Sequence, residues 1–141
     1  MSPTNSSAER WNAVHPPGTQ VIAYPDRDGE PLYTWTRSLA MAHGHGRPVV
    51  LVEGHAAVLP LSRVDVGPWK LTPENYGHID EATDRDNAFA KQYTAALNGQ
   101  IVTVGMRIGE RPNRIIARFG DTIVRLNAGT YIVRAAEGAA S

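Results

Sequence analysis

The apolar residues of this chain fall mostly into short runs with strand-like alternation, which predicts a β-rich protein. The strongest run covers residues 47–61 (RPVVLVEGHAAVLPL), in which two apolar segments flank Gly54-His55. Glycine at the first position of a two-residue turn is typical of a type II′ hairpin. Pairing about that turn places Val50 opposite Leu59 and leaves both faces of the hairpin apolar. Because such a hairpin must be covered on both sides, we expect it to form the centre of the core.

Shorter strands are predicted on both sides of this hairpin. They cover residues 19–24 and 31–37, and a single turn with a short last strand follows over residues 62–66. Several short strands joined by tight turns are typical of a small SH3-like barrel. We therefore predict such a barrel over residues 11–66. The polar, Ser-rich residues 1–10 are predicted to be a disordered tail.

A pattern of apolar residues with helical spacing follows this first unit. Phe89, Tyr93 and Leu97 recur at a spacing of four residues and would form one apolar stripe on a helix. Acidic residues precede them, where they suit the positive end of a helix dipole. The Asn-Gly pair at residues 98–99 is typical of a helix end. We predict a helix over about residues 82–97, within a linker that covers residues 67–98.

Strand-like patterns return after Gly99. We predict strands at Gln100–Met106, Asn113–Phe119, Thr122–Leu126 and Thr130–Arg134. A hairpin about Gly120-Asp121 would separate the apolar residues onto one face and an Arg/Ile surface onto the solvent face. The predicted fold class is therefore mostly β with one helix. It comprises an SH3-like barrel, a helical linker, a second small β-barrel or hairpin unit over residues 99–135, and a disordered tail over residues 136–141.

The composition narrows the class of protein. Apolar residues make up 42% of the chain and charged residues 20%, which is ordinary for a globular protein. Without cysteine the chain forms no disulfide and no thiolate metal site. No apolar run reaches the ~18 residues of a membrane span, and the N-terminus carries no secretion signal. We expect a cytoplasmic protein that does not contact a membrane, in the host cytoplasm if it is encoded by a phage.

Arginine supplies the best candidate for a binding surface. The formal net charge is zero, but residues 101–141 carry six Arg against three acidic residues. Guanidinium groups bind phosphate and carboxylate in two-pronged fashion. The candidate partner-binding residues are Arg107 and Arg111 in the loop before the second hairpin, and Arg114, Arg118 and Arg125 on its outer face. Aromatic residues for base stacking are absent from that face, so an Arg-rich protein interface or a solvated strand face is the alternative.

The first unit offers an aromatic candidate. Tyr24, Tyr33 and Trp35 either line a cleft for a peptide or a cation, or belong to the core. Of these, Tyr33 and Trp35 are counted among the partner-binding residues.

Two metal sites are weaker alternatives. His43, His45 and His55 would supply imidazoles to zinc, but histidines in Gly-rich turns are more often solvated. The acidic residues 80–86 would suit magnesium, but a helix dipole explains them better. We predict no cofactor, no nucleophile elbow and no phosphate-binding glycine loop.

Residues 11–66 resemble a family of short uncharacterised proteins from actinobacteria and from their phages and integrative elements. The residues that carry the resemblance are Trp11-Asn12, Pro17-Gly18-Thr19, Val21, Thr36-Arg37-Ser38, His45-Gly46, Pro48-Val49-Val50, Val52-Glu53-Gly54, Leu61 and Val64. The resemblance implies a phage or mobile-element origin, and it implies no activity.

Three classes of function follow from these patterns. The first is a non-enzymatic binding protein that engages a protein or a nucleic acid through the Arg-rich strand face. The second is a structural component of a phage particle that assembles through exposed sheet edges, which leaves a homo-oligomer open. The third is a small enzyme acting on nucleotides or nucleic acid, which is the weakest because no acid–base pair stands out.

Overall fold

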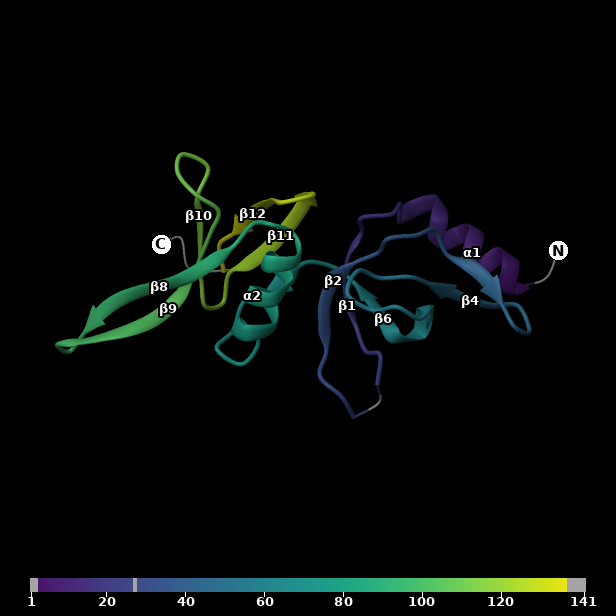
Figure 1. The fold of residues 1–141 in the computed structure, drawn as a ribbon, viewed down its shortest axis with the longest axis horizontal. Coiled ribbons are helices and arrows are strands. Elements are labelled where there is room, and N and C mark those ends of the chain that lie inside the picture. The colour runs from purple at the N-terminus through teal and green to yellow at the C-terminus, as the bar shows by residue number, and fades with distance from the viewer. Residues whose placement is uncertain (1–2, 27, 137–141) are drawn as a thin grey trace. The chain divides into compact units, whose positions relative to one another are not determined.

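A computed structural model describes residues 3–26 and 28–136 of the chain (Figure 1). These residues are mostly β, with 43% in strands and 16% in helices, so the mostly β part of the prediction is confirmed. The chain divides into two compact units between Gly67 and Pro68. Among the described residues there are two helices rather than one, and the strands form four small three-stranded sheets.

Unit 1 is built around two antiparallel sheets with the strand orders β2-β1-β6 and β3-β4-β5. Its elements are α1 (Pro3–Val14), β1 (Gln20–Ala23), β2 (Leu32–Trp35), β3 (Met41–His43), β4 (Arg47–Val50), β5 (Leu59–Pro60), the 3-10 turn η1 (Leu61–Arg63) and β6 (Val64–Val66). The predicted single turn and short last strand at residues 62–66 are thus confirmed. The described residues form no closed barrel.

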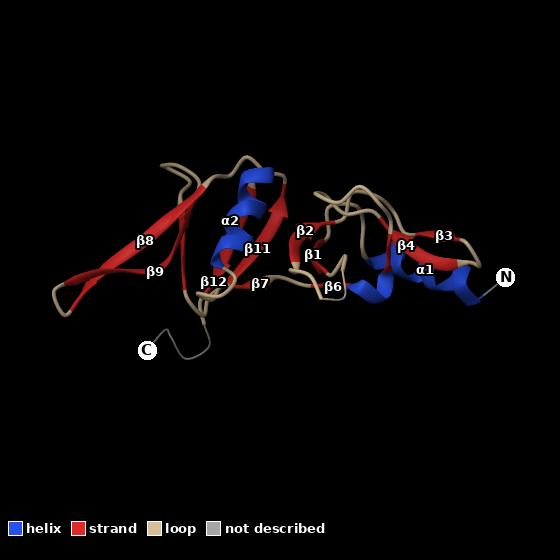
Figure 2. Ribbon diagram, turned by 60° about the horizontal axis from the view of Figure 1, so that its bottom comes forward, coloured by secondary structure: helices blue, strands red, loops and turns tan. Residues whose placement is uncertain are grey.

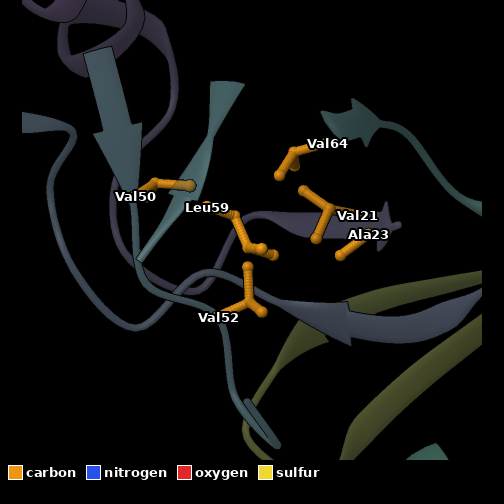
Figure 3. Close-up of a cluster of buried hydrophobic side chains, with 6 residues drawn as sticks. All are labelled: Val21, Ala23, Val50, Val52, Leu59 and Val64. Carbon is orange, nitrogen blue, oxygen red and sulfur yellow. The ribbon is translucent and has the colours of Figure 1, made fainter. Parts of the chain in front are cut away.

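The core of unit 1 confirms the central role of the strand pair at residues 47–61. Its buried cluster consists of Val21, Ala23, Val50, Val52, Leu59 and Val64 (Figure 3). Val50 lies opposite Leu59, as the alternation predicts. Side chains from β1 and β6 thus meet on this pair, which buries apolar area that would otherwise contact water.

The prediction of a tight turn at Gly54-His55 is wrong, because the chain pairs with a different strand after Val50. Val52 forms a bridge with Thr36 instead of pairing with the strand that follows. Two backbone hydrogen bonds join these segments, from the Arg37 N–H to the Leu51 carbonyl and from the Glu53 N–H to the Trp35 carbonyl. Residues 51–58 therefore form a loop that is pinned to the end of β2.

The predicted disordered tail over residues 1–10 is also wrong where the structure describes it. Residues 3–10 belong to α1, and residues 1–2 lie outside the described part. Ala8 is buried and Trp11 packs on the core, a spacing of three that suits one face of a helix. The Asn12 side chain fixes this helix, since its amide bonds both the carbonyl and the N–H of Ala40.

Unit 2 contains a helix and two further sheets with the strand orders β10-β9-β8 and β12-β11-β7 (Figure 2). Its elements are β7 (Trp69–Lys70), α2 (Tyr76–Arg85), β8 (Ala90–Leu97), β9 (Gln100–Ile108), β10 (Ile115–Arg118), β11 (Thr122–Asn127) and β12 (Thr130–Arg134). Residues 68–98 are therefore part of this unit and are not a linker. Trp69, Leu71, Ile79, Met106 and Ile123 are its largest fully buried apolar side chains.

The helix predicted over residues 82–97 is wrong after Arg85, and the helix begins earlier than predicted, at Tyr76. The helix ends at Arg85, and β8 follows and pairs with β9. Asn98 and Gly99 have φ of 51° and 78°, the left-handed pair that a type I′ hairpin turn requires. The Asn-Gly sequence reverses a strand here, and the two strands extend as a long ribbon from the rest of unit 2 (Figures 1 and 2).

The hairpin predicted about Gly120-Asp121 is wrong as well. β10 pairs with β9, whereas β11 pairs with β12 and β7. The chain crosses between sheets at Gly120, whose N–H bonds the Leu71 carbonyl while the Leu71 N–H bonds the Asp121 carbonyl. The Asp121 carboxylate accepts the N–H groups of Arg118 and Ala136, which fixes this corner.

No helix within the described ranges is long and apolar enough to cross a lipid bilayer. Of the tail predicted at residues 136–141, only Ala136 lies in the described part, where its N–H bonds Asp121.

Candidate functional site

The strand register of β8, β9 and β10 gathers basic side chains on one face of their sheet. Lys91 and Ile116 both pair with Arg107, and Tyr93 and Arg118 both pair with Gly105. Since alternate residues of a strand point to the same side, these two rows share one face, together with Arg114. We call Lys91, Tyr93, Arg107, Arg114 and Arg118 the basic face.

The opposite side of the same sheet explains why these residues face outward. Met106, Ile108 and Ala117 alternate with the basic face along β9 and β10, and all three are buried. Ile79 and Ala82 of α2 are buried in the same unit. Because the apolar residues must be covered, the alternation leaves the arginines of β9 and β10 on the outer side.

A glycine brings the strands of the basic face close together. A Cβ at Gly105 would fall on the carbonyl oxygen of Ala117 and 2.8 Å from the Cα of Arg118. Its position therefore admits only hydrogen in place of a side chain. Across this gap the Arg118 guanidinium lies over the Tyr93 ring, with Cζ 5.6 Å from the ring centroid. That distance is within the range of a cation–π contact.

A pocket of about 250 Å³ opens at one end of the basic face. Its lining includes four cationic side chains, from Lys91, Arg107, Arg111 and Arg114, and the single carboxylate of Glu110. The Nε of Arg107 is buried and has no hydrogen-bond partner among the described residues. We call this cavity the basic pocket. Guanidinium groups keep their proton at any ordinary pH, so the pocket is suited to holding an anion rather than to acid–base chemistry.

The structure adds three residues that sequence reasoning missed. Lys91 and Tyr93 lie on the basic face, and Phe89 lines the basic pocket with 57% of its surface exposed. All three fall in the stretch assigned to a helix, which separated them from the arginines. The signal that finds them is the Asn-Gly pair at residues 98–99, which predicts a hairpin where alternating strands flank it.

Arg125 is not on the solvent face, which corrects one of the predicted binding residues. Its guanidinium donates to both carboxylate oxygens of Asp86, at 2.8 and 2.9 Å, and the two side chains are only 5% and 4% exposed. The Tyr131 hydroxyl donates to the same carboxylate at 2.6 Å. Arg125 and Tyr131 are partners in the β11–β12 register, so one strand pair presents both groups to the end of α2.

The protonation of this buried cluster follows from its hydrogen bonds. Burial by itself raises the pKa of Asp86, but the bonds from Arg125 and Tyr131 outweigh it and hold the pKa below its usual value. Burial and the bond to Asp86 raise the pKa of the Tyr131 hydroxyl. Asp86 is therefore a carboxylate and Tyr131 a neutral donor at neutral pH.

The other predicted arginines divide between strand and loop. Arg107 lies within β9 rather than in a loop, and Arg111 lies in the exposed loop between β9 and β10. Arg114 is half-buried just before β10, and Arg118 ends that strand and is exposed. Four of the five predicted arginines thus border one face or one pocket.

The aromatic and histidine candidates of unit 1 are not brought into a comparable site. Trp35 is buried, Tyr33 is half-buried and Tyr24 is 38% exposed. His43 and His45 are exposed near the β3–β4 turn, while His55 lies in the loop after Val52. Within the described ranges no three His, Cys, Asp or Glu side chains are grouped so that they could hold a metal ion, and this applies to the acidic residues 80–86 as well.

Comparison of the chain with known protein families, curated proteins and solved structures finds no match.

Proposed function

We propose that this protein is a non-enzymatic binding protein that holds single-stranded nucleic acid on the basic face. The observation that carries the proposal is the direct pairing of Lys91 with Arg107 across two strands. Like charges placed opposite each other destabilise a sheet, so a ligand with negative charges is the natural counterpart. Phosphate groups spaced along a strand supply such charges.

The aromatic residues favour single strands over duplexes. Tyr93 lies among the cations of the basic face, and Phe89 lies at the edge of the basic pocket. Stacking of unpaired bases on aromatic rings contributes about 1–3 kcal/mol per base, and a duplex hides the faces of its bases. An acidic peptide would satisfy the cations but would leave the exposed Phe89 ring without a flat partner.

Fluorescence anisotropy with a labelled single-stranded oligonucleotide at several salt concentrations tests the proposal. Lys91→Glu/Arg118→Glu should weaken binding and reduce the slope of log K against log salt, by about 0.7 for each phosphate that the variant no longer neutralises. Arg134→Glu, on an exposed residue of β12 in the same unit, reverses one charge and is the control for the single reversals Lys91→Glu and Arg118→Glu. Absence of wild-type binding at low salt, or equal weakening by the control, contradicts the proposal.

A second candidate function, as an assembling structural component, rests on the ribbon formed by β8 and β9. No acidic or basic residue occurs between Lys91 and Arg107, and the apolar Leu97 and Ile101 near its turn are 54% and 72% exposed. Natural sheet edges usually carry charges or proline that prevent pairing with another strand. A two-stranded ribbon is also marginally stable alone. This ribbon is suited to pair with its own copy in a homo-oligomer.

Sedimentation of two charged variants tests self-pairing. Thr94→Lys/Ala96→Lys and Thr94→Glu/Ala96→Glu should each be monomeric, because like charges would meet between the copies. Their equimolar mixture should regain the oligomer, since the charges are then opposite. A wild-type protein that stays monomeric at high concentration removes this candidate.

For unit 1 we propose an SH3-like arrangement and, with the family that residues 11–66 resemble, a phage or mobile-element origin with action in the host cytoplasm. Support for the arrangement comes from β1, which pairs with both β2 and the last strand β6, and from the Thr36–Val52 bridge that joins the two sheets. An experimental structure of the chain in which the two sheets stack without joining would contradict the arrangement.

A further inference from the structure

Phe89 combines exposure with an unusual backbone conformation. Its side chain is 57% exposed, and its φ is 48°, in the left-handed region. A bulky residue is rare in that region because its Cβ crowds the backbone, and such strain persists where the surroundings impose it. Residues held in this way are frequent at ligand-binding sites. An exposed apolar ring on a strained backbone is costly for stability, so its presence requires an explanation.

Termination of α2 does not explain the conformation of Phe89, because Asn87 already ends the helix. Asn87 has φ of 58° and follows Asp86, the C-cap of α2, at a position where a left-handed residue commonly ends a helix and asparagine tolerates the conformation. The helix is thus already closed two residues before Phe89.

The conformation of Phe89 is imposed by the buried Thr83. The backbone carbonyl of Thr83 accepts the N–H of Ala88 at 2.9 Å, and the Thr83 hydroxyl accepts the N–H of Ala90 at 3.3 Å. The Ala88 carbonyl in turn accepts the N–H of Gly109 at 3.1 Å. Bonds on both sides of Phe89 therefore fix the backbone that carries the ring.

The ring lies between two cavities of unit 2. Phe89, Gly109 and Glu110 line the basic pocket and also line a larger open pocket of about 590 Å³. The larger pocket has apolar walls that include Ile108 and Ile115, and it also has polar groups. Those polar side chains include Asn87, Asn113 and Thr130. Its size and mixed lining are typical of a site for a small organic group.

We propose that this larger pocket receives one nucleobase stacked against Phe89, while the phosphate of the same nucleotide occupies the basic pocket. The ligand class is a nucleotide unit, either a free nucleotide or one residue of a single strand. The inference rests on the proposed function and adds a base-binding position to it. Flat aromatic bases stack on an aromatic ring, and the amide and hydroxyl groups suit the edge of a base.

A binding cycle tests the inference with two probes. One is a labelled oligodeoxythymidylate of about ten nucleotides, and the other is a strand of the same length whose sugars carry no bases. Phe89→Ala should weaken binding of the first probe roughly tenfold, equal to about 1.4 kcal/mol, and leave binding of the second unchanged. Phe89→Trp should bind the first probe as well as the wild type does. Competition by deoxythymidine monophosphate distinguishes the two ligands. If the natural ligand is a free nucleotide, the monophosphate should displace the labelled probe at a concentration similar to that of the oligonucleotide. If the natural ligand is a strand, the monophosphate should not displace the probe at that concentration.

The outcomes separate this inference from the proposed function. If both probes bind and Phe89→Ala changes neither, the base pocket is wrong and the basic face stands. If neither probe binds to the wild type, the proposed function and the inference both fail.

A stability measurement gives a readout that does not depend on the ligand. Asparagine tolerates the left-handed conformation, so Phe89→Asn should raise the thermal midpoint above that of Phe89→Ala by a few degrees, while both lose base binding equally. A lower midpoint for Phe89→Asn than for Phe89→Ala would show that the ring position is not strained, and would remove the main support for the inference.

Discussion

Unit 2 uses arginine in two opposite ways. Arg125 is buried and bonds both oxygens of Asp86, whereas Arg118 is exposed and lies over the Tyr93 ring. Both residues follow an isoleucine by two positions in a short apolar strand, so the local patterns are similar. The difference comes from the partner strand. β11 pairs with β12, which brings Tyr131 beside Arg125, and β10 pairs with β9, which brings Gly105 beside Arg118.

The comparison shows that a basic strand face cannot be inferred from alternation alone. A buried arginine requires an acceptor of opposite charge, and Asp86 at the end of α2 supplies that carboxylate. The basic face has no acidic residue within its two rows, and its Lys91 and Arg118 side chains are exposed. Substitutions in the buried cluster and on the basic face should therefore differ in both size and kind of effect.

The largest effect is expected for Asp86→Asn. Removal of the carboxylate leaves the buried Arg125 guanidinium without its counter-charge, and breaking a buried pair costs about 3–5 kcal/mol. Hydrogen exchange of the β11 and β12 amides in the full chain measures the loss locally. Lys91→Glu/Arg118→Glu serves as the comparison and should shift these amides by less than about 0.5 kcal/mol. Similar losses for both variants would show that the two uses of arginine do not differ.

The next largest effect is expected for Gly105→Val. A side chain at this position collides with the backbone of β10, and overpacking of this kind costs about 1–3 kcal/mol or more. The amides of β9 and β10 should exchange faster. Gly77→Val in α2, where an added Cβ meets no atom within 4 Å, is the control for the added bulk itself. Equal effects at the two positions would mean that close approach of the strands at Gly105 is unimportant.

The pH dependence of stability should separate the buried cluster from the basic face. The folded pKa of Asp86 is lowered, so its contribution is fully present above the unfolded value of about 3.9 and is lost as pH falls through the folded pKa. The folded pKa of Tyr131 is raised, so its contribution is present below about pH 10 and is lost at higher pH.

Unfolding by urea between about pH 2 and pH 11 measures both limits. Asp86→Asn should flatten the acid side of the curve, and Tyr131→Phe should flatten the alkaline side. Arg118→Glu is expected to leave the alkaline side unchanged. An acid limb in Asp86→Asn as steep as that of the wild type would contradict the role of the cluster.

The smallest effect is expected at the turn of the ribbon. Gly99 has φ of 78°, and Gly99→Ala should cost about 1 kcal/mol because alanine is strained there. The loss should be confined to amides of β8 and β9 near the turn. If the basic face depends on the ribbon, this variant should also weaken oligonucleotide binding slightly, and Asn98→Gly should not.

The strands after Gly99 could be predicted because their pattern is local. β9, β11 and β12 follow from alternating apolar residues between turn residues, and Val50 opposite Leu59 follows from the same alternation in unit 1. The helix over residues 82–97 failed because a spacing of four fits both periods. Four residues slightly exceed one helical turn of about 3.6 residues and also equal two strand repeats, so Phe89, Tyr93 and Leu97 satisfy both.

In the candidate site, too, some residues could be found from the sequence and others only from the strand register. The grouping of Arg107, Arg111, Arg114 and Arg118 was visible in the sequence, and it made them candidates for a binding surface. Lys91 and Tyr93 were not visible beside them, because only the register of β8 with β9 places them on the same face.

By itself the sequence determined where most strands run, which strand pair anchors the core of unit 1, and that arginine is concentrated in the last third of the chain. These properties depend on residues that are neighbours along the chain. The tertiary structure alone decided which strands pair, and therefore that Arg125 is buried against Asp86 while Arg118 lies open over Tyr93. Hydrogen bonds between strands are formed by backbone groups common to nearly all residues, so the choice of partner depends on packing across the whole unit.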